Sequence, residues 1–172
     1  MAEQRTLAPR DLVVRAADRA GMEEECFRHP LNANSELHGF ELGRKVGLRR
    51  VGVNLLRVPP RRESYAFHSH AAEEEWMYVL SGHGIAEIGN ETFEIGAGDF
   101  VGFPAGCFAH HVRNPHDEPL VYLCGGEVTT IDVADFPRSG RRVVRTGREV
   151  VVYPVSAGEP LFGPGQRHGD GR

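Results

Sequence analysis

The chain has 172 residues, of which 40% are apolar and 26% are charged. This length fits one domain with a proper core, and the composition differs from the charge-rich, apolar-poor mix of disordered chains. The net charge is −4 and the Lys and Arg residues are scattered, which argues against a nucleic-acid partner. Charges or glycines interrupt every apolar stretch within about ten residues, so no membrane span is predicted.

The cysteines suggest a reducing compartment. Cys26, Cys107 and Cys124 form an odd set without CxxC spacing, which does not predict a disulfide framework. The N-terminal residues lack the basic and apolar segments of a signal peptide. We therefore expect a cytoplasmic protein.

Short runs rich in β-branched and aromatic residues recur along the chain, separated by glycines and prolines. This pattern is typical of all-β domains. Gly89-Asn90 stands between two short alternating runs and predicts a hairpin turn. At least seven strands are expected, which indicates a barrel or a sandwich. The expected strands are 51–58, 65–70, 76–80, 85–88, 91–95, 100–103, 108–114, 120–124 and 148–153.

The two ends of the chain differ from this β-rich part. Residues 11–18 fit either a strand or a short helix, and periodicity does not decide between them. Residues from 154 onward contain many glycines and prolines and predict an extended tail. The expected organisation is an N-terminal arm over 1–34, a barrel over 35–153 and a C-terminal tail over 154–172.

A His-x-His pair predicts a metal site. His68 and His70 stand two positions apart in an extended run, so their side chains point to the same side. Glu75 begins the next run and shares its face with Met77 and Val79, which places the carboxylate on the apolar interior side. An unpaired carboxylate there would be costly, and a bound cation would remove that cost.

A fourth ligand is predicted in the run 108–114. His110 shares its strand face with Val112, whereas His111 shares the opposite face with Arg113, so His110 is expected to point inward. Three imidazoles and a carboxylate suit a divalent transition metal, namely Fe, Mn, Ni, Co or Zn, and suit calcium poorly. An octahedral shell would keep about two positions open, which is typical of a catalytic site.

Two stretches carry a family resemblance. HSHAAEEEWMYVLSG over 68–82 resembles the first cupin motif, and GDFVGFPAG from residue 98, with His110 and Asn114, resembles the second. The resemblance covers about residues 50–126 and extends to a bacterial group of small single-domain cupins. It implies a double-stranded β-helix, or jelly-roll barrel, and a homodimer. The implied metal ligands are His68, His70, Glu75 and His110.

The second motif departs from the family pattern. Three residues separate Gly106 from His110 where two are common, so His111 remains a rival for the fourth ligand position. Arg62 stands where a Gly usually precedes the first motif. Cys107 lies near the expected metal loop and is interpreted as a small buried thiol.

The acidic run before Trp76 offers more than one candidate carboxylate. Glu74 is a rival for Glu75, although Gly82 stands at the motif's spacing from Glu75. Glu73 and Glu74 are interpreted as a solvated acidic edge.

Open coordination positions inside a barrel predict a metal-dependent enzyme acting on a small polar organic molecule. The resemblance to cupin dioxygenases is placed slightly ahead of the resemblance to cupin isomerases and decarboxylases. The alternatives are a non-catalytic module that binds or senses a small ligand, and a scaffold with an incidental metal. The sequence leaves open whether turnover occurs.

Overall fold

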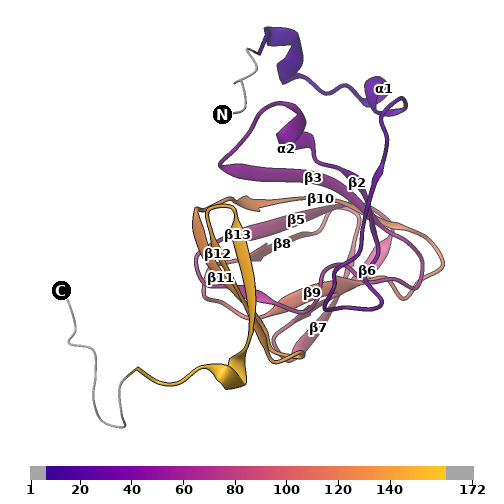
Figure 1. Ribbon diagram of the computed structural model, residues 1–172. Coiled ribbons are helices and arrows are strands. Elements are labelled where there is room, and N and C mark those ends of the chain that lie inside the picture. The colour runs from indigo at the N-terminus through magenta and orange to yellow at the C-terminus, as the bar shows by residue number, and fades with distance from the viewer. Residues whose placement is uncertain (1–6, 162–172) are drawn as a thin grey trace.

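The computed structural model describes residues 7–161 and consists mostly of β-strands, which confirms the predicted all-β class (Figure 1). The short helical segments are η1 (Pro9–Leu12), α1 (Ala16–Arg19), α2 (Leu42–Lys45) and η2 (Val155–Ala157). Within residues 7–161 no helix has the length and apolar character needed to cross a bilayer. The strands are β1 (Glu25–Phe27), β2 (Leu37–Phe40), β3 (Val51–Val58), β4 (Ser69–His70), β5 (Glu75–Ser81), β6 (His83–Ile88), β7 (Glu91–Gly96), β8 (Phe100–Phe103), β9 (His110–Arg113), β10 (Leu120–Glu127), β11 (Ile131–Phe136), β12 (Arg141–Thr146) and β13 (Glu149–Pro154).

The strands form two layers. The first layer is a six-stranded antiparallel sheet in the order β1-β2-β3-β10-β5-β8. The second combines the sheet β13-β12-β11-β4 with the sheet β7-β6-β9. The segment 62–70 joins these two sheets. His68 exchanges two backbone hydrogen bonds with His110 of β9, at 3.1 and 2.7 Å, and His70 pairs with Ala134 of β11.

Apolar side chains from both layers fill the space between them. Met77 and Val79 of β5 are 3% and 0% exposed, and they pack in one cluster with Ala86 of β6 and Val112 of β9. Alternate residues of a strand face the same side, so Glu75 shares the inward face of Met77 and Val79, as predicted. The core thereby directs the Glu75 side chain between the layers.

Two turns fix the strands that carry the site. Gly89, with a φ of 60°, begins the predicted hairpin turn, and Ile88 pairs with Glu91 across it. Gly82 links β5 to β6 with a φ of 77°, and a Cβ there would lie 2.2 Å from the carbonyl oxygen of Pro119. Only glycine fits this close approach, because it lacks a Cβ and adopts positive φ without strain.

The structure differs from the sequence expectations in several segments. The region 11–18 contains parts of η1 and α1 and no strand. Of the run 65–70, only Ser69–His70 belongs to a named strand. The last predicted strand is confirmed as β13, while β1, β2, β11 and β12 were not predicted. Residues 1–6 and 162–172 of the two expected arms lie outside the described residues.

Candidate metal centre

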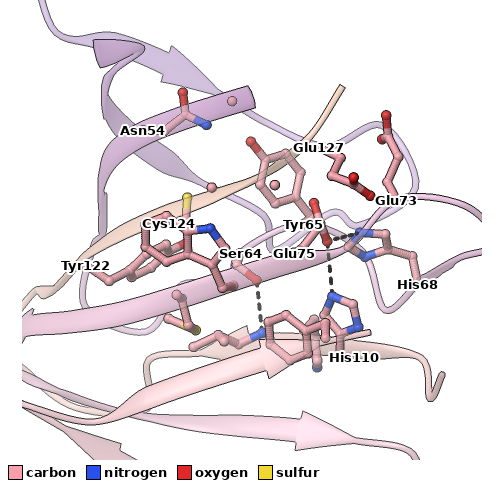
Figure 2. Close-up of a pocket in the computed structure, with 18 of the residues that line it drawn as sticks. Asn54, Ser64, Tyr65, His68, Glu73, Glu75, His110, Tyr122, Cys124 and Glu127 are labelled. Atoms are coloured by element: carbon pink, nitrogen blue, oxygen red, sulfur yellow. Dashed lines mark hydrogen bonds and ion pairs between the residues drawn. The ribbon is translucent and has the colours of Figure 1, made fainter. Parts of the chain in front are cut away.

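Three imidazole rings converge on the carboxylate of Glu75. The Nε2 atoms of His68 and His70 each lie 3.6 Å from Oε2 of Glu75, and Nε2 of His110 lies 3.2 Å from the same oxygen. Figure 2 shows the Glu75 carboxylate between His68 and His110, with dashed lines to both. The structure therefore brings the three histidines named from the sequence to one oxygen atom of the fourth residue, Glu75.

These side chains come from both layers. Glu75 is the first residue of β5, in the six-stranded sheet, and His110 is the first residue of β9 opposite. The backbone bridge between His68 and His110 fixes their relative register, and it places their ring centroids 4.9 Å apart. The ring of Phe103 stacks on that of His110 at 3.6 Å between centroids, which restricts the rotation of the imidazole.

The second nitrogen of two rings is anchored to the backbone. Nδ1 of His68 lies 2.8 Å from the carbonyl oxygen of Ala66, and Nδ1 of His110 lies 3.2 Å from that of Phe108. A carbonyl oxygen only accepts hydrogen bonds, so Nδ1 carries the hydrogen in both rings. When these rings are neutral, their Nε2 lone pairs face the Glu75 carboxylate.

His70 is anchored differently, by a buried carboxylate. Its Nδ1 lies 2.6 Å from Oδ2 of Asp132, which is 5% exposed. The other oxygen of Asp132 accepts the backbone N–H of Ala72 at 3.1 Å. Burial raises the pKa of Asp132, but the hydrogen bonds from His70 and from the backbone of Ala72 and Val133, with the charge of His70, together outweigh burial and lower the pKa below its usual value. Asp132 is therefore ionised and holds the hydrogen on Nδ1 of His70.

Electron-rich atoms that face one another in this way form a site that can hold a cation. An ion bound at about 2.0–2.2 Å by each ligand would hold neighbouring ligand atoms about 3 Å apart. The observed separations of 3.2 and 3.6 Å are close to this value. The ligand atoms of His68, His70 and Glu75 all lie within 4.8 Å of one another, and His110 joins this set through Glu75. The donor set fits a divalent transition metal.

The electrostatics keep these groups in the forms that bind a metal. Burial raises the pKa of Glu75, but its interactions with the nearby rings of His110, His68 and His70 together outweigh burial and hold the pKa well below its usual range. Burial also lowers the pKa of His110, although its hydrogen bond to Glu75 acts in the opposite direction. An ionised carboxylate beside a neutral imidazole is the state in which both are ligands.

Two cavities meet at these residues. The inner cavity, of about 240 Å³, is lined by Tyr122, Cys124, Asn54 and His110, among others (Figure 2). The outer cavity, of about 540 Å³, is lined by residues that include His29, Phe27, Asp132, Phe136, Val143 and Val150. The walls of both cavities include Tyr65, His68, Glu73, Glu75 and Arg145. A small molecule in either cavity would therefore contact the candidate centre.

The interpretation of Glu73 as part of a solvated edge is wrong. Glu73 is 7% exposed, and Oε1 accepts hydrogen bonds from the backbone N–H and the hydroxyl of Thr129, at 2.5 and 3.1 Å. The same oxygen is paired with the guanidinium of Arg145. Only Glu74 is exposed as expected. It therefore does not compete with Glu75 for the site.

His111 lies apart from the candidate centre. Its Nε2 is 3.1 Å from Oε2 of Glu87 and 3.2 Å from Nη1 of Arg138, so the ring is bonded away from Glu75. The residue lines a second pocket beside Phe67 as well as part of the inner cavity. The opposite facing of His110 and His111 agrees with the parity argument. The expectation of a buried thiol at Cys107 is wrong, because this residue is exposed in the loop before β9.

The sequence did not lead us to three further residues of the site, Asp132, Arg145 and His29. Asp132 was detectable, since it alternates with Ala134 and Phe136 along a strand face that is otherwise apolar. A charge in phase with a buried face indicates a polar partner inside. Arg145 and His29 carry no comparable local signal, and only the pairing of distant segments places them beside the outer cavity.

Comparisons with known proteins agree with this architecture. A sequence profile of the cupin domain matches residues 54–126. A candidate sugar phosphate isomerase from Acidithiobacillus ferrooxidans has a crystal structure that is 35% identical, covering 91% of this chain and 100% of that one with a TM-score of 0.87. The structure of a sugar phosphate isomerase from Silicibacter pomeroyi is 26% identical, covering 81% and 89%, with a TM-score of 0.71.

An uncharacterised protein of Methanocaldococcus jannaschii is 37% identical over 67 residues, which is 39% of this chain. The chain spans about half the length of that curated relative, 53%.

Proposed function

This chain belongs to the cupin family, and from that premise we propose that it is a metal-dependent isomerase acting on a small sugar phosphate. The proposed ligands of a divalent transition metal are His68, His70, Glu75 and His110. Isomerisation of an aldose to a ketose moves hydrogen between adjacent carbons, and a metal bound to the substrate oxygens would stabilise the enediolate-like charge.

The observation that carries the proposal is the convergence of three Nε2 atoms on one Glu75 oxygen, at the junction of two cavities. The fixed Nδ1 hydrogens of His68 and His70 keep their free nitrogens directed at that point. A preorganised ligand set beside space for a molecule supports catalysis rather than a closed structural site.

Arg145 supports a phosphate-bearing substrate. Among the described residues that line either cavity, it is the one Lys or Arg side chain. Its side chain is 26% exposed, so an anion in the outer cavity could reach the guanidinium while Glu73 remains bonded to Thr129. Guanidinium groups bind phosphate oxygens through two hydrogen bonds.

The relatives favour isomerisation over the oxygen chemistry that the motifs alone placed slightly ahead. The two solved structures reported above, at 35% and 26% identity, are described as sugar phosphate isomerases, the first of them as a candidate. Isomerisation by this chain can be tested directly.

The test measures hydrogen exchange in D₂O. Protein freed of metal and reloaded with Mn, Fe, Co, Ni or Zn would be incubated with aldose and ketose phosphates of four to six carbons. We expect conversion and deuterium incorporation at C1 or C2, detected by NMR, with at least one metal. Glu75→Gln should lose this activity, and His83→Ala, which alters an exposed histidine at the start of β6, should keep it.

Two results would contradict the proposal. A wild-type protein that binds no divalent metal would remove its basis. A metal-loaded protein that binds a sugar phosphate without exchange or conversion would instead indicate the non-catalytic sensing module.

A further inference from the structure

His29 is a third histidine on the wall of the outer cavity, together with His68 and His70. It follows β1 and precedes the turn that leads to β2. Its backbone N–H donates to Oγ of Ser35, at 3.1 Å, and Ser35 is 1% exposed. The backbone of His29 is thus attached to a buried residue, although the segment lies near the edge of the first sheet.

The ring of His29 has a defined tautomer. The backbone N–H of Leu31 donates to Nδ1 of His29 at 3.1 Å. A backbone N–H only donates, so Nδ1 must offer its lone pair, and the hydrogen of the neutral ring must be on Nε2. Within residues 7–161 no hydrogen bond engages that Nε2 atom. The ring therefore lines the cavity with one donor that has no partner in the described part of the chain.

Aromatic rings keep this donor in position. The ring centroid of His29 lies 5.2 Å from that of Phe136, and 6.1 Å from those of Phe27 and Tyr65. Burial among these rings lowers the pKa of His29, and the nearby His68 lowers it further. The neutral ring is consequently the form present near neutral pH.

The same aromatic residues connect His29 to the candidate metal centre. Phe136 stacks on His68 at 5.5 Å between centroids, and Tyr65 contacts the His68 ring at 6.3 Å. Each of these two side chains therefore contacts both histidine rings. A molecule of a few carbon atoms bound beside Glu75 would extend along this aromatic wall to His29.

We propose that His29 binds the substrate directly, by donating a hydrogen bond from its neutral Nε2–H to a carbonyl or hydroxyl oxygen. This inference rests on the proposed function, because it requires an oxygen-rich molecule beside Glu75. His68 and His70 direct their Nε2 atoms at Glu75. Among the histidines of the outer cavity, His29 is therefore the one whose Nε2–H can donate to a bound molecule. A neutral donor polarises a substrate oxygen without adding a charge that would repel the metal.

Two substitutions separate the nitrogens of the ring. His29→Asn retains a short side-chain oxygen that can accept the N–H of Leu31, but it loses the donor at the Nε2 position. His29→Gln places an amide N–H near the former Nε2. We expect about a tenfold loss of affinity for fructose 6-phosphate in His29→Asn. His29→Gln should recover part of it, and metal content should be unchanged in both variants.

The tautomer is tested independently of activity. In the zinc-loaded, ¹⁵N-labelled protein, long-range ¹H–¹⁵N correlation should show His29 protonated at Nε2 alone, with the Nε2 signal shifting on addition of fructose 6-phosphate. A ring protonated at Nδ1 would overturn this inference alone. Binding that leaves the His29 signals unmoved and the His29→Asn affinity intact would do the same. If neither fructose 6-phosphate nor glucose 6-phosphate binds the wild type, this inference fails together with the sugar phosphate substrate.

Discussion

Nδ1 of His70 lies 2.6 Å from Oδ2 of Asp132, a residue that is 62 positions later in the sequence. The pairing of β4 with β11 brings them together, because His70 is opposite Ala134. A carboxylate that accepts the hydrogen of a metal-binding imidazole fixes its tautomer and raises its basicity. Asp132 is therefore expected to control the affinity of His70 for a metal.

Asp132→Asn should weaken metal binding by about 10- to 100-fold. Asp132 accepts from both His70 and the backbone of Ala72, and an amide has only one accepting oxygen. If that oxygen faces Ala72, the amide N–H₂ faces Nδ1 and forces the ring hydrogen onto Nε2. Competition titration with a chelator measures the loss. Asp135→Asn, on the same strand but ion-paired with Arg142 at the surface, is the control and should bind as the wild type does. Equal affinities for the two variants would refute this role.

The two adjacent histidines of β9 should respond differently to substitution. His110→Gln should reduce metal affinity more than tenfold, because it removes a nitrogen that faces Glu75. His111→Gln should leave the affinity unchanged, since this ring contacts Glu87 and Arg138. Both are buried, so thermal unfolding must accompany each titration. The reverse order of affinities would make His111 the ligand.

The part of the site that depends on local pattern was predictable from the sequence. The spacing of His68 and His70, and the alternation of Glu75 with Met77 and Val79, identify the inward faces without knowledge of the sheet order. The short hairpin at Gly89 is equally local. These features depend on residues that are close in sequence.

The remaining features depend on contacts between distant segments. Glu73 resembles a surface acid until Thr129 and Arg145 are known to surround it. The same holds for Asp132, since its partner His70 is on a different strand. Sheet order and the packing of β11 and β12 determine these contacts, and periodicity within one strand does not contain that information.

Glu73→Gln should lower the free energy of unfolding by about 1 to 3 kcal/mol. The substitution removes the charge that pairs with Arg145 and weakens the hydrogen bonds from Thr129. Urea denaturation of the metal-free protein, with midpoint and slope compared, measures the change. Glu74→Gln alters the exposed neighbour and should change stability by less than about 0.5 kcal/mol. Similar losses in the two variants would show that the buried contacts of Glu73 add nothing.

Glu87 should make the fold sensitive to acid. Burial raises its pKa, but hydrogen bonds from Arg138 and His111 outweigh burial and lower the pKa from 4.5 to about 2. Between these values the unfolded chain binds a proton that the folded chain does not, so stability falls as the pH falls. The contribution of Glu87 is complete above about pH 4.5 and lost near pH 2.

The difference in unfolding free energy between wild type and Glu87→Gln isolates this effect. It should be largest above pH 4.5 and shrink steadily toward pH 2, in urea titrations of the metal-free protein. Glu94→Gln, on the exposed surface of the neighbouring β7, is the control for replacing a glutamate on this sheet and should change the unfolding free energy only slightly. A constant difference for Glu87→Gln over this range would contradict the low pKa.

The most direct test of the candidate centre is anomalous diffraction from crystals of the full chain loaded with manganese or zinc. The account predicts one strong peak within about 2.0–2.3 Å of the Nε2 atoms of His68 and His70 and a Glu75 oxygen, with His110 completing the shell. An ion bound elsewhere, or an empty space between these side chains at saturating metal, would contradict it.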